Sequence, residues 1–155
     1  MRFQYYVVDV DGLPADDRAE VCRLVIHTLE ETAVHFEADI PWTQASAWPA
    51  NVRDAAEVMV AASGKTHTEA PYQQTGMMNV GDKAVWQAFA TFAGYAYDAS
   101  VWSDNRVLPV VSLADEGQSV VVRVDEEERA RLEVAVAPTP VVPLRESRAQ
   151  GRRRG

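Results

Sequence analysis

Apolar residues recur with two different periods along the chain, and these periods predict the elements of the fold. Residues 2–10 are rich in aromatic and β-branched types, which predicts a strand that ends before Gly12 and Pro14. Spacings of three and four residues predict a long amphipathic helix over 15–37 and a second helix over 52–63. The segment between these helices, residues 39–50, is expected to be a loop because Pro41 and Pro49 interrupt regular structure.

The best-patterned stretch is residues 82–132, which predicts the structural centre of the domain. Asp82 is expected to cap a third helix that ends at Gly94. Three short strands are expected next, over 95–102, from Val110 up to the turn at 115–117, and over 120–124. Because their links are short, these strands should form an antiparallel meander. Asp125 and Glu128 then have the spacing of a capping box, which opens a short helix.

Three other segments have weaker patterns. Residues 64–81 show no clear period, so we expect a long loop with a short strand around Met77–Val80. Leu132, Val134 and Val136 alternate, which predicts that the last helix gives way to an extended segment. From Pro138 onward, proline, glycine and arginine dominate, which is typical of a disordered tail.

Together these elements predict an α+β fold. The expected order is a strand, three helices, an antiparallel three-strand meander and a short C-terminal helix. The first strand should join the meander in one sheet, with the helices packed on one face. We expect one globular domain over residues 1–137, followed by the disordered tail, residues 138–155.

The composition places the chain among ordinary globular proteins and favours the cytoplasm. Of its 155 residues, 47% are hydrophobic and 25% are charged, with no apolar window long enough to span a membrane. The N-terminus lacks the layout of a signal peptide, since Asp9 and Asp11 come too early. The single cysteine, Cys22, rules out an internal disulfide framework.

Charge is distributed unevenly, and this changes the expected partners. The net charge is −8, yet residues 138–155 contain five arginines and one glutamate. The remaining body therefore carries 10 basic and 22 acidic side chains, a net charge of −12. Such a body should repel nucleic acid and attract a partner protein with a basic surface.

Two fragments point to an enzyme instead. VVDVDGL at residues 7–13 and NVGDKAVW at 79–86 resemble motifs of the haloacid dehalogenase-like phosphatases, although Leu13 and Trp86 depart from that pattern. The resemblance implies a magnesium-dependent hydrolase in which Asp9 is the nucleophile, Asp11 the general acid/base and Asp82 a later acidic group. The alternative is that the first fragment is a strand ending in a glycine turn and that Asp82 only caps its helix.

Binding residues are expected on the two predicted loops, residues 39–50 and 64–81, and at the end of the strand predicted over 95–102. Ser63-Gly64-Lys65-Thr66 lacks the first glycine of a phosphate-binding loop, and His67-Thr68-Glu69 lacks the later cysteines of a zinc deaminase. Exposed aromatic and polar side chains there could anchor a protein interface, although the aromatic ones could equally cover the ends of the core. The candidate binding residues are Trp42, Trp48, His67, Glu69, Tyr72 and Trp102.

Two functional hypotheses therefore follow. The first is a non-catalytic, acidic protein-binding domain without metal or cofactor, such as a bacterial immunity or antitoxin protein that blocks a basic partner. The second is the magnesium-dependent hydrolase, which requires Asp9, Asp11 and Asp82 to converge within one coordination shell.

Overall fold

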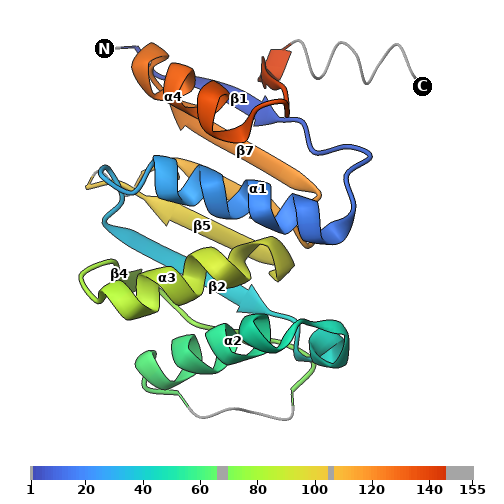
Figure 1. The fold of residues 1–155 in the computed structure, drawn as a ribbon. Coiled ribbons are helices and arrows are strands. Elements are labelled where there is room, and N and C mark those ends of the chain that lie inside the picture. The colour runs from blue at the N-terminus through green and yellow to red at the C-terminus, as the bar shows by residue number, and fades with distance from the viewer. Residues whose placement is uncertain (1, 66–69, 105–106, 146–155) are drawn as a thin grey trace.

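A computed structural model describes residues 2–65, 70–104 and 107–145, and shows four α-helices packed on one face of an antiparallel sheet (Figure 1). The helices are α1 (Ala15–Thr28), α2 (Ala50–Ala62), α3 (Lys83–Phe92) and α4 (Glu126–Val136), with 3-10 segments η1 (Trp42–Ala47) and η2 (Ala93–Tyr95). The strands are β1 (Gln4–Val8), β2 (His35–Ile40), β3 (Gln73–Gln74), β4 (Met78–Asn79), β5 (Asp98–Trp102), β6 (Val111–Ala114), β7 (Ser119–Val124) and β8 (Val141–Pro143).

The sheet confirms the predicted α+β class and the predicted meander. Its strand order is β3-β2-β5-β6-β7-β1-β8, and β4 pairs with β2. The strands β5, β6 and β7 follow one another as antiparallel neighbours, and β1 joins them beside β7. The described sheet has eight strands, more than the sequence predicts, because β2, β3 and β8 extend it at both sides.

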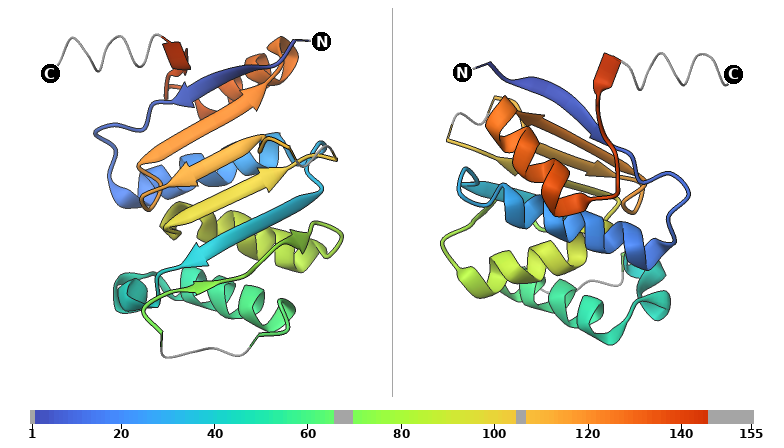
Figure 2. Two further views of the ribbon diagram at one scale, coloured as in Figure 1. Left: turned by 180° about the vertical axis from the view of Figure 1, so that it is seen from behind. Right: turned by 45° about the horizontal axis from the view of Figure 1, so that its top comes forward.

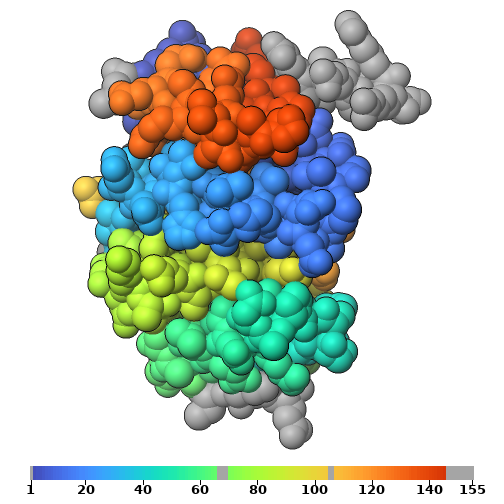
Figure 3. All heavy atoms as spheres, viewed as in Figure 1, coloured from blue at the N-terminus to red at the C-terminus, as the bar shows by residue number. Residues whose placement is uncertain are grey.

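The helices lie side by side in the order α4, α1, α3, α2 and cover one face completely (Figures 1 and 3). The core fills the space between this layer and the sheet, with Phe36, Phe89, Leu132 and Val122 all fully buried. None of the described helices covers the other face of the sheet, as the view from behind shows (Figure 2). An antiparallel sheet can leave one face open to water because its strands alternate between apolar and polar sides.

The prediction of one helix over 15–37 is wrong, because α1 ends at Thr28 and residues 35–40 form β2. Glu30 and Glu31 would place negative charge at the C-terminal end of the helix dipole, which is unfavourable. Beyond them, Phe36, Ala38 and Ile40 are buried in strict alternation, which is the period of a strand. Pairing with β5, β3 and β4 makes β2 a central element of its half of the sheet.

The C-terminal predictions also need correction. Leu132 and Val136 are buried one helical turn apart in α4, while Val134 is 82% exposed, so this segment is helical and not extended. Residues 141–143, within the tail predicted to be disordered, form β8 and pair with β1. The predicted domain boundary after residue 137 therefore falls before a strand of the sheet; residues 146–155 lie outside the described part.

Several local predictions are confirmed. The Asp82 carboxylate accepts hydrogen bonds from the amides of Ala84 and Val85 at the start of α3. Asp125 and Glu128 form the predicted capping box at the start of α4. The expected short strand around residues 77–80 is β4, paired with the first two residues of β2.

One glycine sets how closely the helix layer packs. Gly94 lies in η2 against α1, where an added Cβ atom would lie 2.6 Å from the Ala19 Cα atom. No side chain fits at that distance, so the contact between η2 and α1 requires glycine. The absence of a side chain at Gly94 thus allows η2 to pack directly against Ala19 of α1.

Candidate functional site on the open face of the sheet

The open face of the sheet is built by every second residue of its strands. Register places these side chains in rows that cross the sheet, so residues far apart in sequence become neighbours. The middle of the face is occupied by small or aliphatic side chains. Its members are Val7, Ser100, Ser112, Ala114, Ser119 and Val121.

One end of this face is acidic. Glu37 and Asp39 of β2 and Asp98 of β5 surround a hollow of about 410 Å³, which Gln74 and Ser100 help to line. Ala38 pairs with Ala99, so Asp39 and Asp98 lie opposite each other on neighbouring strands. Like charges directly opposite each other on antiparallel strands destabilise the sheet. We call Glu37, Asp39 and Asp98 the acidic end.

The electrostatics of Asp39 reflect this crowding. Burial of the carboxyl group raises its pKa, and the nearby charge of Asp98 raises the pKa further. A hydrogen bond with the Gln74 side chain acts in the opposite direction and partly offsets both effects. Ionisation of Asp39 in the folded protein therefore costs free energy, and the hydrogen bond with Gln74 offsets only part of that cost.

Basic side chains do not neutralise the acidic end within the described part of the chain. None of the ion pairs formed by the described residues includes Glu37, Asp39 or Asp98. Lys65 approaches the same region, but its ammonium group donates to the Gln74 backbone carbonyl at 3.0 Å. The acidic end thus presents three carboxylates to whatever approaches the open face.

The rim of the acidic end is held in place by Thr75. Its amide donates to the Ala38 carbonyl, and its hydroxyl oxygen accepts from the Ala38 amide, both at 3.0 Å. The same hydroxyl group donates to the Gly76 carbonyl at 2.8 Å. Gly76 has a φ angle of +71°, a backbone conformation that favours glycine. These contacts fix the segment after β3 against β2, beside the carboxylates.

The other end of the open face is cationic and aromatic. Arg123 of β7 lies opposite Tyr5 of β1, and its guanidinium carbon is 4.9 Å from the centre of the Phe3 ring. Trp102, a predicted binding residue, lies half-buried on this face opposite His35. The open face therefore changes from acidic to basic between its two ends.

The other predicted aromatic anchors lie away from the open face. The Trp42 and Trp48 rings are 5.9 Å apart, and Trp48 packs edge-on against Phe92 at 5.2 Å. The Trp42 indole nitrogen also donates to the buried Gln73 side chain at 3.1 Å. Both indoles are half-buried and close one end of the core.

The remaining predicted residues are not gathered into one cluster with the indoles. Tyr72 directly precedes β3 and is 49% exposed. His67 and Glu69 lie outside the described residues. The structure thus places Trp42 and Trp48 together and Trp102 on a different face.

Asp9, Asp11 and Asp82 are not brought together. Asp9 follows β1, where its carboxylate accepts from the Asp11 amide at 3.1 Å, and Gly12 completes the turn. Asp82 caps α3, whose first residues lie far from the end of β1 in both Figures 1 and 2. Within the described ranges, no group of three or more His, Cys, Asp or Glu side chains is arranged to hold a metal ion.

Comparison of the chain with protein-family models, with curated proteins and with solved structures finds no match. None of the helices in the described part is long and apolar enough to cross a membrane.

The acidic end is not among the residues predicted from the sequence. Glu37 falls there at the end of the helix predicted over 15–37, and Asp39 falls in the predicted loop 39–50. The signal that could have revealed them is the alternation of Phe36, Ala38 and Ile40, which puts the intervening acidic residues on the opposite face of a strand.

Proposed function

We propose that this protein is a non-catalytic binding domain that docks a basic partner protein on the acidic end of its open sheet face. The observation that carries the proposal is the direct opposition of Asp39 and Asp98 on an uncovered face, next to Glu37. Three carboxylates kept together without belonging to any described ion pair cost stability, and proteins commonly retain such costs where they serve binding.

Charge complementarity indicates the chemistry of the partner. An arginine or lysine side chain that entered the hollow would relieve the repulsion between Asp39 and Asp98 and would form charge-assisted hydrogen bonds. The Ser100 hydroxyl and the Gln74 side chain, which line the same hollow, offer neutral polar groups beside them. A nucleic acid would be repelled, because its phosphates carry the same sign as these carboxylates.

The overall charge supports the same conclusion at longer range. A body with a net charge of −12 raises the rate at which a basic protein encounters it, and the effect weakens as salt rises. An immunity or antitoxin protein that must quickly block a basic toxin in the cytoplasm has this requirement. We therefore propose that role as the specific form of the binding function.

The test compares two triple variants with the same change in net charge. The first variant, Glu37→Gln with Asp39→Asn and Asp98→Asn, removes the acidic end. The control variant, Asp17→Asn with Asp54→Asn and Glu127→Gln, removes three exposed carboxylates from the helix layer. Each is used as bait, together with the wild type, for basic proteins from cells that express this chain, and the affinity of the purified partner is then measured.

The wild type and the control should retain the same basic protein, and the first variant should lose it. The loss should be about tenfold or more in affinity, since truncating charges at a protein interface commonly costs more than ~1.4 kcal/mol. The affinity of the wild type should also fall steeply as salt is raised. Equal retention by both triple variants would show that overall charge, and not the acidic end, selects the partner, and would refute the proposal.

A further inference from the structure

Opposite charges of the open face lie at two diagonal corners of the sheet. Asp39 and Asp98 lie opposite each other at one end of β2 and β5. The register of β5 with β6, and of β6 with β7, brings Asp98 level with Ser119, the first residue of β7. Arg123 lies near the other end of β7, opposite Tyr5 of β1. The acidic end and Arg123 are therefore separated both across the strands and along them.

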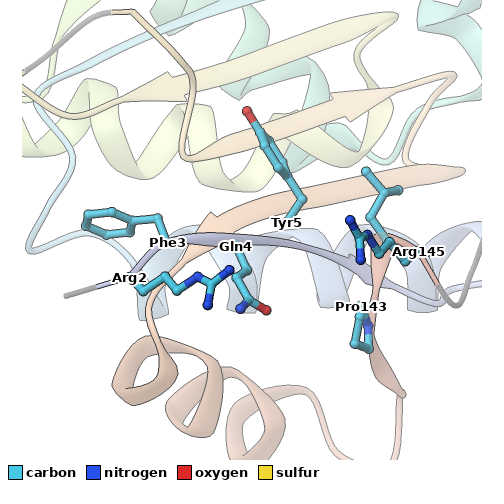
Figure 4. A pocket seen from close by; sticks show the side chains of 7 residues that line it. Arg2, Phe3, Gln4, Tyr5, Pro143 and Arg145 are labelled. Atoms are coloured by element: carbon cyan, nitrogen blue, oxygen red, sulfur yellow. The ribbon is translucent and has the colours of Figure 1, made fainter.

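The corner around Arg123 combines positive charge with exposed aromatic surface. Its guanidinium carbon is 4.9 Å from the centre of the Phe3 ring, and Phe3 and Tyr5 are 43% and 39% exposed. Arg2 and Arg145 line a hollow of about 350 Å³ together with these two aromatic residues (Figure 4). None of the ion pairs formed by the described residues includes Arg123. We call Arg123, Phe3 and Tyr5 the cationic corner.

The surface between the two corners can be covered without burying a charge. Its side chains are small or aliphatic, uncharged and half-buried. They are those of Val7, Ser100, Ser112, Ala114, Ser119 and Val121. Side chains of this size let a second sheet approach to about 10 Å, which is the usual distance between packed sheets.

A second copy of the chain matches this distribution of charge. Consider a two-fold axis that lies in the plane of the interface, perpendicular to the line that joins the two corners. This axis places the cationic corner of each copy over the acidic end of the other, so every contact is made twice. Arg123 of one copy then meets Asp39 and Asp98 of the other, where its guanidinium group forms charge-assisted hydrogen bonds with the carboxylates.

We propose that the open face is the interface of a two-fold homodimer, in which the cationic corner of each copy covers the acidic end of the other. The face is formed by β2, β5, β6, β7, β1 and β8. Strand spacings of about 4.8 Å and strand lengths of about 17 Å give this face an area of about 400 Å² on each copy. An interface of this size is small, so the dimer is weak and forms as protein concentration rises.

The dimer would regulate the site proposed for the basic partner. Because the second copy covers the acidic end, the partner protein must displace it before binding. This consequence rests on the proposed function, whereas the dimer itself stands on the charges and side chains of the open face.

The test measures the oligomeric state of the full chain by sedimentation velocity, from about 1 µM to about 1 mM protein. The wild type should change from monomer to dimer over this range, and added salt should weaken the dimer. Arg123→Asp and Asp98→Arg each place like charges against each other at both contacts of a homodimer. Each variant should therefore dimerise at least about tenfold more weakly than the wild type.

An equimolar mixture of these two variants should restore the dimer. In the mixed dimer, Asp at position 123 of one copy faces Arg at position 98 of the other, and the second contact keeps the original Arg123 and Asp98. Arg53→Asp and Asp54→Arg are the matched controls on α2, where both side chains are exposed. They are needed because a net charge of −8 opposes self-association, and each should dimerise like the wild type.

Two further measurements separate this proposal from loss of folding and from the proposed function. Far-UV circular dichroism reports the folding of each variant. If Arg123→Asp does not fold, Arg123→Gln takes its place and should also weaken the dimer. Arg123→Asp leaves the acidic end intact, so it should still bind the basic partner protein. A dimer without any basic partner would refute only the proposed function, and a basic partner without a dimer would refute only this inference.

Three results would overturn the homodimer. The first is a wild type that remains monomeric up to about 1 mM. The second is equal dimerisation of the wild type, the position 123 variant and Asp98→Arg, which would place the interface on another surface. The third is a mixture of Arg123→Asp and Asp98→Arg that stays monomeric while both α2 controls dimerise, because the two corners would then not meet.

Discussion

Acidic side chains occur in two regions of this molecule, and the two regions treat them differently. On the helix layer, carboxylates are interleaved with bases: Glu20 pairs with Arg23, and Arg129 pairs with both Glu126 and Glu133. On the open face, Asp39 and Asp98 oppose each other on neighbouring strands and belong to none of the described ion pairs.

This difference shows that carboxylates can affect the stability of the fold in two opposite ways. Carboxylates spaced three or four residues from a base on a helix are a normal solvated surface and give the fold a little stability. Carboxylates placed opposite each other give up stability, so their position calls for a different reason. The net charge alone, which is all that the composition provides, does not distinguish the two regions.

The largest effect on stability should come from the helix layer. Changing Asp125→Ala removes the carboxylate that accepts the Glu128 amide and breaks the capping box of α4. Loss of such a cap costs about 0.5–2 kcal/mol of unfolding free energy, here near the upper value because Glu128 is buried. Urea denaturation measures this loss, and an unchanged midpoint would contradict the role assigned to the cap.

A smaller effect, of opposite sign, should come from the open face. Asp39→Asn keeps the shape of the side chain and removes one of two opposed charges, so it should raise the unfolding free energy by about 0.2–1 kcal/mol at pH 7. Asp54→Asn is the matched control on α2, where the change should be smaller. If Asp39→Asn destabilised the protein, the carboxylate would have a structural role. That result would contradict the claim that the opposed carboxylates of the open face reduce stability.

The gain from Asp39→Asn should depend on pH. Because the folded-state pKa of Asp39 is raised, the native protein binds this proton up to a higher pH than the unfolded chain, whose value is about 3.9. The wild type therefore loses stability relative to the variant as pH rises through this window, and the difference levels off above the folded-state pKa. Unfolding curves between about pH 3 and 7 measure this, and a gain that is as large at pH 3 would contradict the assigned cause.

The smallest effect should come from an exposed pair on α1. Arg23→Ala removes the partner of Glu20, yet both side chains are largely solvated, so the expected loss is at most about 0.5 kcal/mol. Thermal unfolding at low and high salt measures it, and the small difference should shrink as salt rises. A loss above about 1 kcal/mol would place this pair outside the behaviour of exposed ion pairs.

The sequence predicts the second half of the fold well because local signals agree there. Asp82 and Asp125 are helix caps followed by clear apolar periods, and the links between β5, β6 and β7 are short. Local propensity, pattern and turn chemistry point to the same elements in this region. The meander of β5, β6 and β7 can therefore be predicted without knowing any contact between distant parts of the chain.

The first half is harder because a helix period and a strand period overlap between residues 28 and 37. Leu29, Thr32, Ala33 and Phe36 continue the spacing of α1, while Phe36, Ala38 and Ile40 begin that of β2. Pairing with β5, a contact across the sequence, decides in favour of the strand. β8 is likewise stabilised by its pairing with β1, which the proline-rich composition of that segment conceals.

The candidate site depends on the same long-range pairing. Asp98 is nearly 60 residues from Asp39 in sequence, and only the register of β2 with β5 makes them neighbours. The aromatic residues predicted as anchors are recognisable by type, but their packing on Phe92 and Gln73 is not visible in the sequence. Residue type thus predicts a binding site on the loops. The acidic end on the open face instead arises from the pairing register of β2 with β5.

The central claim is that the acidic end, and not the acidic surface as a whole, receives basic side chains. Its most direct test is a titration of the isotope-labelled protein with a ten-residue peptide in which arginine alternates with glycine, followed by backbone amide shifts. We predict that the shifts gather at Glu37, Asp39, Asp98 and Ser100 and disappear in the triple variant of the acidic end. Shifts that instead follow α1 and α4, or that spread evenly over all exposed carboxylates, would contradict the claim.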